Sequence, residues 1–107
     1  MEIVYSPEFD RALNDYYSYI KDQLKSPAAA ARCANEILDR SEILKIAPLS
    51  GLAVFTESGK DTEIRILFSG HHAILYSIEE DAVRVSALLD MRTKESNDLL
   101  NEIRGNP

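Results

Sequence analysis

The segment from Glu63 to Arg92 constrains the fold more than any other part of the chain. It contains three short runs rich in Ile, Val, Leu, Phe and Tyr, separated by Ser69-Gly70 and by an acidic triplet at 79–81. Runs of β-branched and aromatic residues between short turn signals are typical of strands joined by tight turns. The segment therefore predicts an antiparallel β-meander.

Alternation along these strands predicts two unlike sheet faces, because successive strand side chains point to opposite sides. The second face is mixed, with Glu63, Arg65, Arg84 and Ser86 among apolar residues, and it is either plain solvated surface or a cleft lined by these groups. The first face is apolar, is expected to lie under helices, and carries Ile64, Ile66, Phe68, His72, Ile74, Tyr76, Ile78, Val83, Val85, Ala87 and Leu89.

Two helices are predicted before the meander. Serine followed by proline occurs at Ser6-Pro7 and again at Ser26-Pro27, and each pair is typical of a helix start. Apolar residues recur at spacings of three and four from Phe9 to Leu24, and residues 28–46 are rich in alanine and other helix formers. The brief junction between the two segments predicts an antiparallel helical hairpin.

The remaining segments complete one domain. Residues 1–5 form a β-prone run, Val54-Phe55 is a further brief extended piece, and 93–104 is expected to be a short third helix capped by Thr93. That last segment is alternatively a tail that orders against a partner. The sequence thus predicts a single α+β domain over 1–107, in which an N-terminal strand and a helical hairpin pack on the meander and a short C-terminal helix follows.

Composition limits the function classes. The chain of 107 residues has 12 basic and 18 acidic side chains, a net charge of -6, and such a surface repels a phosphate backbone unless its cations are gathered locally. General nucleic-acid binding is therefore not expected. No apolar run is long enough for a membrane span and the chain starts without a signal-peptide pattern, so a cytoplasmic protein without membrane contact is expected.

Cofactor and metal motifs are not expected. The four glycines are isolated from one another, which excludes a glycine-rich phosphate loop, and the single Cys33 cannot form an internal disulfide. His71 and His72 are adjacent, and on a strand they would point to opposite sides, so joint chelation of one metal is not predicted.

Several residues, taken in order, resemble the superfamily of bacterial type II toxins that includes RelE and ParE. The resemblance covers nearly the whole chain. It rests on the early strand before Ser6-Pro7, Tyr19-Ile20, the alanine-rich second helix with Ile37 and Leu44, Pro48-x-x-Gly51, Ile64-Arg65, Gly70, Ala73-Ile74-Leu75-Tyr76, Asp81-x-Val83-x-Val85 and Arg92.

The resemblance implies a helical hairpin on one face of an antiparallel sheet and a toxin neutralised by a cognate antitoxin. RelE-like members cut messenger RNA on the ribosome, whereas ParE-like members poison DNA gyrase. Arg65 matches a basic strand residue of the RelE-like group, but Ala73 stands where that group has an arginine, and Asp90 where histidine or glycine is common. The chain is therefore closer to the ParE-like branch.

Three hypotheses follow for the function. The first is a ParE-like toxin that binds gyrase through cations in or after the meander, with Arg65, Arg84, Arg92 and Lys94 as candidates. The second is a ribosome-dependent mRNA endoribonuclease, with catalytic candidates Arg65, Arg92, Glu63, His71 and His72. The third is a degenerate family member that binds partners without toxicity.

Overall fold

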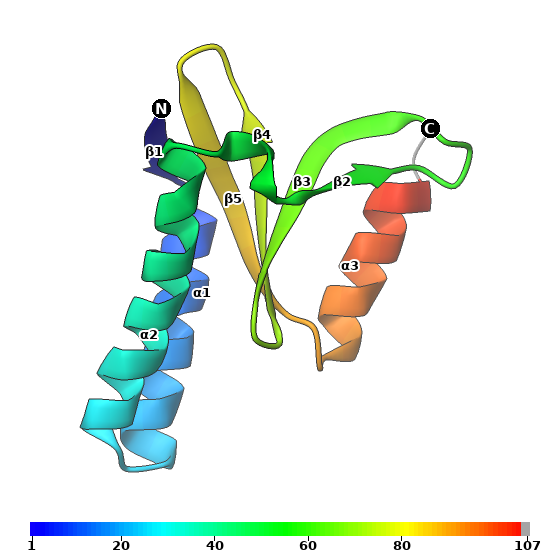
Figure 1. Ribbon diagram of the computed structural model, residues 1–107. Helices are drawn as coiled ribbons and strands as arrows, with labels where there is room; N and C mark the ends of the chain where they lie inside the picture. The colour runs from blue at the N-terminus through cyan, green and yellow to red at the C-terminus, as the bar shows by residue number, and fades with distance from the viewer. Residues whose placement is uncertain (106–107) are drawn as a thin grey trace.

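The structure is a computed structural model that describes residues 1–105. Its order of elements agrees with the predicted one (Figure 1). The elements are β1 (Glu2–Tyr5), α1 (Pro7–Ser18), the π-helical turn η1 (Tyr19–Gln23), α2 (Pro27–Ser41), the 3₁₀ turns η2 (Glu42–Lys45) and η3 (Pro48–Ser50), β2 (Leu52–Phe55), β3 (Asp61–Ser69), β4 (His72–Ile78), β5 (Ala82–Asp90) and α3 (Lys94–Gly105).

A five-stranded sheet with the order β1-β5-β4-β3-β2 forms the centre of the fold. The predicted meander is confirmed, because β3, β4 and β5 pair consecutively and antiparallel. The N-terminal strand β1 joins the sheet parallel to β5, and β2 pairs antiparallel with β3 at the opposite edge. The Val54-Phe55 segment therefore belongs to a true edge strand.

The helical hairpin begins as the two serine-proline pairs predict, although the two starts differ in detail. The Ser6 hydroxyl accepts a hydrogen bond of 3.0 Å from the backbone N–H of Phe9, which satisfies one of the free donors of the first turn. Helix α2 starts at Pro27, but the Ser26 side chain makes no cap hydrogen bond within the described chain. Of the three clustered tyrosines, Tyr16 and Tyr17 are partly buried and Tyr19 is exposed.

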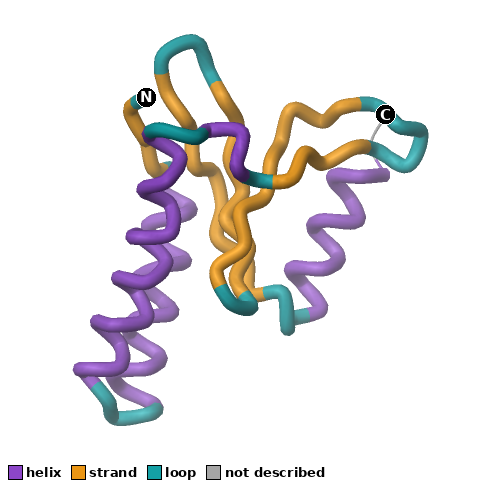
Figure 2. Tube along the Cα trace, viewed as in Figure 1, coloured by secondary structure: helices purple, strands orange, loops and turns teal. Residues whose placement is uncertain are grey.

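Both faces of the sheet are covered, which corrects the expectation of one apolar and one mixed face. Figures 1 and 2 show α1 and α2 on one side and α3 on the other. On the hairpin side the buried cluster comprises Phe9, Ile37, Leu44, Leu67, Ile74, Tyr76, Val83, Val85 and Leu88. On the α3 side it comprises Val54, Ile66, Ala73 and Leu75, with Leu100 and Ile103 among the residues packed against them.

A β-bulge explains why the predicted alternation fails in β5. Tyr76 pairs with Val85, whereas the adjacent Leu75 pairs with Ala87, which leaves Ser86 as the extra residue. An extra residue shifts all later side chains to the opposite face. Val83 and Val85 therefore face the hairpin together with Leu88, while Ala87 and Leu89 pack on the α3 side.

The C-terminal segment is an ordered part of this fold. Helix α3 runs from Lys94 to Gly105, and Thr93 caps it by accepting a hydrogen bond of 3.2 Å from the N–H of Ser96. The Arg104 side chain also donates to the carbonyl of Phe55 on β2 at 3.2 Å. Among residues 1–105 no helix has the length and apolar character needed to cross a membrane.

Candidate functional sites

The candidate residues from the sequence lie in two separate groups along the sheet. Arg65 on β3 is opposite Tyr76 of β4, whereas His72 at the other end of β4 is opposite Asp90 of β5. Tyr76 and His72 are four residues apart on one strand, a separation of about 13 Å. Glu63 and Arg65 therefore lie at one end, and His71, His72 and Arg92 at the other, so one catalytic centre does not contain them all.

Arg65 forms hydrogen bonds with the backbone of the loop before β2. Its guanidinium donates to the carbonyl oxygens of Leu49 at 3.1 Å and Gly51 at 2.7 Å. The Arg65 Nε is buried and has no hydrogen-bond partner within the described chain. Arg65 thus has a direct structural role.

The same loop is held by Tyr76, which is fully buried. The Tyr76 hydroxyl donates to the Pro48 carbonyl at 2.7 Å and accepts from the Gly51 N–H at 2.8 Å. A Cβ on Gly51 would lie 2.5 Å from the Tyr76 hydroxyl and 2.8 Å from the Ile66 carbonyl, so only glycine fits this close approach. The Pro48-x-x-Gly51 motif and Tyr76 are therefore two parts of one contact, which we call the loop lock (Pro48–Gly51, Arg65 and Tyr76).

The opposite end of the meander brings together His71, His72, Asp90 and Arg92, which we call the histidine cluster. The two imidazole centroids are 4.4 Å apart, and the His71 Nε2 lies 3.9 Å from the Asp90 Oδ2. This corrects the prediction that the histidines point to opposite sides. Strand alternation does not apply to His71, because it belongs to the turn before β4.

Arg92 dominates the electrostatics of Asp90. Its Nε and Nη2 donate to the two carboxylate oxygens at 3.1 and 2.9 Å, and its backbone N–H donates to Oδ1 at 3.0 Å. These bonds lower the pKa of the Asp90 carboxyl to about 2. Asp90 is therefore ionised at neutral pH.

Unlike Asp90, the neighbouring imidazole of His72 is held in its neutral form, and the main cause is burial. His72 is only 5% exposed, and burial, together with the nearby His71, lowers its pKa. The Tyr16 ring of α1 packs on it, with centroids 4.4 Å apart, and burial, followed by the nearby Cys33, raises the pKa of the Tyr16 phenol. His72 is therefore a neutral imidazole at pH 7.

A cavity of about 440 Å³ opens beside the histidine cluster, between α1 and the ends of β4 and β5. Tyr16, Tyr19, His72, Asp90 and Arg92 are among its lining residues. The sequence reasoning missed Tyr16 and Asp90 as members of this site. The sequence signal that could have revealed the site is a pair of opposite charges two positions apart at the end of an apolar strand, Asp90 and Arg92.

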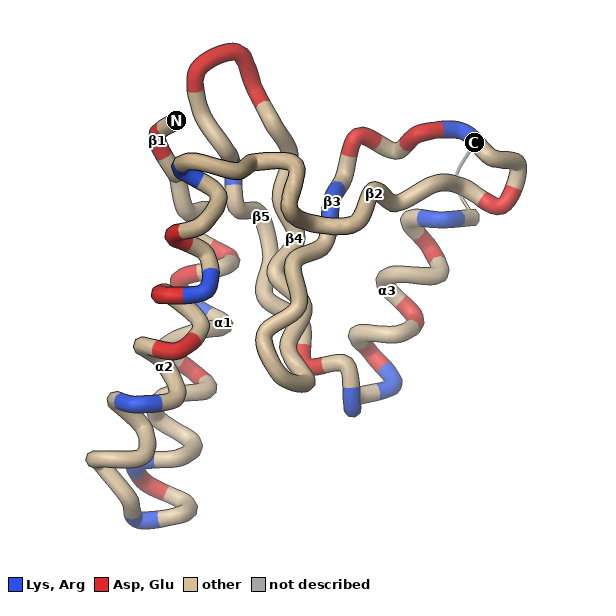
Figure 3. The backbone as a smooth tube through the Cα atoms, viewed as in Figure 1, with Lys and Arg blue, Asp and Glu red and all other residues tan. Residues whose placement is uncertain are grey.

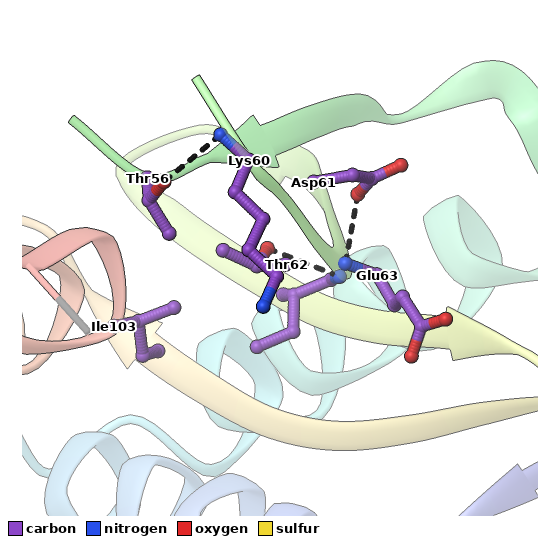
Figure 4. Close-up of a pocket in the computed structure, with 7 residues that line it drawn as sticks. Thr56, Lys60, Asp61, Thr62, Glu63 and Ile103 are labelled. Atoms are coloured by element: carbon purple, nitrogen blue, oxygen red, sulfur yellow. Dashed lines mark hydrogen bonds between the residues drawn. The ribbon is translucent and has the colours of Figure 1, made fainter. Parts of the chain in front are cut away.

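The other predicted cations and Glu63 lie elsewhere on the surface. Arg84 pairs with Glu79 at 2.7 Å near the β4–β5 turn, and Lys94 pairs with Asp98 at 2.7 Å in the first turn of α3. Glu63 lines an open hollow of about 620 Å³ beside the β2–β3 hairpin, and its φ of 66° is in the left-handed region (Figure 4). Local bonds from the Glu63 N–H to Asp61 and from the Ile64 N–H to Thr62 support this backbone turn.

An apolar groove follows the edge strand β2. It has a volume of about 270 Å³ and lies between β2, β3 and α3. Leu52, Phe55 and Phe68 contribute to it and are 66%, 47% and 44% exposed. Since β2 pairs only with β3 in the described chain, its outer edge has no neighbouring strand, although the Phe55 carbonyl accepts a hydrogen bond from Arg104.

Comparison with known proteins identifies the family. The profile of the ParE toxin of the type II toxin-antitoxin system, parDE, matches residues 3–94. Among solved structures, the chain is similar in fold to the chromosomal ParDE toxin-antitoxin system from P. aeruginosa, with a TM-score of 0.69 and 13% identity over 82% of this chain and 92% of that chain. No curated protein sequence matches. The predicted resemblance is confirmed, and the chain belongs to the ParE toxin family of type II toxin-antitoxin systems.

Proposed function

We propose that this toxin arrests growth by binding DNA gyrase, without cutting RNA, and that a cognate antitoxin neutralises it. The observation that carries the proposal is position 73. In the RelE-like pattern this position is an arginine, whereas here Ala73 is fully buried among Val54, Ile66 and Leu75 on the face that α3 covers. At this position the face therefore has no exposed cation that could stabilise the charge developing in the transition state of phosphodiester cleavage.

The charge distribution supports a protein target. Figure 3 shows basic positions spread over the hairpin, the sheet and α3, with acidic positions between them. Arg84, Arg92 and Lys94 each pair with a carboxylate in the structure. Within residues 1–105 this leaves no broad basic face for a polyanion, in agreement with the net charge of -6.

Arg92 and Lys94 are the target-binding residues that the geometry favours. Both are well exposed, with side-chain exposures of 65% and 84%, and both lie where β5 leads into α3. Arg65 is less suited to this role because its donors are used by the loop lock. Exposed cations that are close in sequence fit an acidic surface on a protein partner.

The groove along β2 is the surface that fits an antitoxin. A free backbone edge accepts an extended peptide as an additional strand, and the adjacent apolar pockets give such a peptide specificity. Leu52, Phe55 and Phe68 provide apolar contacts next to that edge. The expected occupant is an extended segment of the antitoxin with apolar side chains at alternate positions.

A supercoiling assay with purified gyrase tests the target. Wild-type toxin should inhibit supercoiling, and the Arg92→Ala/Lys94→Ala variant should lose at least about tenfold in potency. An Arg11→Ala/Arg32→Ala variant is the matched control, because it removes two exposed charges from the hairpin instead. Absence of inhibition at large molar excess of folded toxin would exclude gyrase as the target.

Growth assays separate the remaining hypotheses. Induction without the antitoxin should arrest growth, and co-expression with the antitoxin encoded next to the toxin gene should restore it. Normal growth despite accumulation of folded protein would instead support a non-toxic binding module.

One observation favours the ribonuclease as a second candidate. His71, His72 and Arg92 meet beside a cavity, and imidazoles next to a cation are suited to acid-base work on a phosphodiester. Ribosome-dependent cleavage of messenger RNA that is lost in the Arg92→Ala variant would establish this activity. Equal cleavage by wild type and that variant would count against the histidine cluster as its centre.

A further inference from the structure

The histidine cluster has the donor set of a transition-metal site. One ligand atom from each of His71, His72 and Asp90 lies within 4.8 Å of the other two. The His71 Nε2 is a buried atom without a hydrogen-bond partner in the described chain. A buried imidazole nitrogen next to a carboxylate therefore has an unused coordination position.

The spacing is close to what a metal ion requires. A tetrahedral ion with bonds of about 2.0 to 2.1 Å holds its ligand atoms about 3.4 Å apart. The His71 Nε2 and the Asp90 Oδ2 are 3.9 Å apart, so a small rotation of either side chain closes the gap. His71 belongs to a turn and is half-exposed, which gives it the freedom to rotate.

We propose that His71, His72 and Asp90 bind one divalent transition-metal ion of the Zn²⁺, Co²⁺ and Ni²⁺ class. Two imidazoles and one carboxylate are ligands that these ions prefer, whereas Mg²⁺ and Ca²⁺ prefer oxygen-only sites. Three protein ligands leave one position for water, which the adjacent cavity admits. The site does not depend on the proposed gyrase target.

Coordination requires neutral imidazoles and an ionised carboxylate, because a protonated ligand atom cannot bind the ion. Arg92 is the internal competitor, since it occupies both oxygens of Asp90 and brings a positive charge close to the ion. Metal binding therefore competes with Arg92 for the lone pairs of Asp90 and places the ion near the guanidinium charge.

Titration of tag-free protein with Co²⁺ and Zn²⁺ tests the site. The two histidines of the chain are His71 and His72, so any histidine-dependent binding reports on this cluster. We expect one equivalent of Co²⁺ to give visible absorption bands of a four-coordinate ion, and Zn²⁺ to displace it. Calorimetry with Zn²⁺ should give the same stoichiometry.

Three variants test which side chains bind the metal ion and which one competes with it. His71→Ala, at a half-exposed turn position, should weaken binding at least about tenfold and retain the wild-type circular dichroism spectrum. Cys33→Ser should bind as wild type, which excludes a thiol ligand. Arg92→Ala should tighten binding several-fold, because it removes the competing guanidinium.

Two outcomes would overturn the proposal. One is wild-type affinity for Co²⁺ or Zn²⁺ that is no higher than that of His71→Ala. The other is binding that survives in His71→Ala and disappears in Cys33→Ser. Asp90→Asn provides an independent second variant, since it keeps the size of the side chain, and it should also weaken binding.

Discussion

The loop lock and the histidine cluster lie at opposite ends of the same strands, and they use their polar groups differently. In the loop lock, Arg65 and the buried Tyr76 bind the backbone of residues 48–51. In the histidine cluster, Arg92 and Asp90 bind each other and border a cavity, and His71 keeps a nitrogen without a partner in the described chain. The first arrangement stabilises the fold, and the second leaves groups available for ligands.

The comparison teaches that similar residues in one sheet have different roles according to their partners. Arg65 lies within an apolar strand and Arg92 two residues after the end of another, and both are candidates by sequence. Arg65 donates to backbone carbonyls, whereas Arg92 is largely exposed and paired with one carboxylate. We therefore expect substitutions in the loop lock to lower stability, and substitutions in the histidine cluster to change binding.

The largest expected effect is that of Gly51→Ala. The added methyl group would lie 2.5 Å from the Tyr76 hydroxyl and 2.8 Å from the Ile66 carbonyl, so the lock has to open. We expect a loss of about 3 kcal/mol in the free energy of unfolding, measured by urea denaturation. Gly105→Ala is the matched control, because its methyl group meets no described atom within 4 Å. Equal stability of the two variants would show that the loop is not locked.

Tyr76→Phe should have the next largest effect. It removes a single oxygen but leaves the Gly51 N–H and the Pro48 carbonyl without their partner. We expect destabilisation by about 2 kcal/mol. Tyr19→Phe removes the same atom from a side chain that is 55% exposed, and its unfolding curve should stay close to wild type.

Arg65→Met and Arg92→Ala should separate stability from binding. Arg65→Met keeps most of the side-chain length but loses the bonds to Leu49 and Gly51, so we expect about 1 to 2 kcal/mol of destabilisation. The folded fraction of this variant should inhibit its target as wild type does. Arg92→Ala should show the reverse, with an unchanged unfolding midpoint and weakened inhibition. Loss of inhibition in folded Arg65→Met would assign Arg65 to the binding surface after all.

The sequence predicted the elements well because their signals are local. Ser6-Pro7 marks a helix start through bonds within one turn, and short turn signals separate the strands of the meander. The face assignments failed in β5, where one extra residue changes the register, and between β3 and β4, since Ile66 packs on the α3 side whereas Ile74 packs on the hairpin side. Ser86 is an ordinary polar strand residue in the sequence, and only its pairing reveals that it forms a bulge.

The sites were harder to predict because they depend on contacts between distant residues. Gly51 and Tyr76 are 25 positions apart, and nothing in either local sequence indicates that one contacts the other. His71 was misplaced because the strand was expected to include it, whereas the turn includes it and directs its ring toward His72 and Asp90. Covering of the second sheet face likewise depends on the docking of α3, which strand alternation does not reveal.

The smallest effect, and the sharpest distinction between the two regions, is expected in double-mutant cycles. Tyr76 and Arg65 bind the N–H and the carbonyl of the same residue, Gly51, so either substitution loosens the partner of the other. Tyr76→Phe combined with Arg65→Met should therefore be less destabilising than the sum of the single changes, by about 0.5 kcal/mol or more. Tyr76→Phe combined with Arg92→Ala should be additive, because the two side chains share no partner and belong to regions at opposite ends of the meander. Coupling in the second cycle would mean that the loop lock and the histidine cluster are energetically connected through the strand, and their separation into a structural and a binding region would no longer hold.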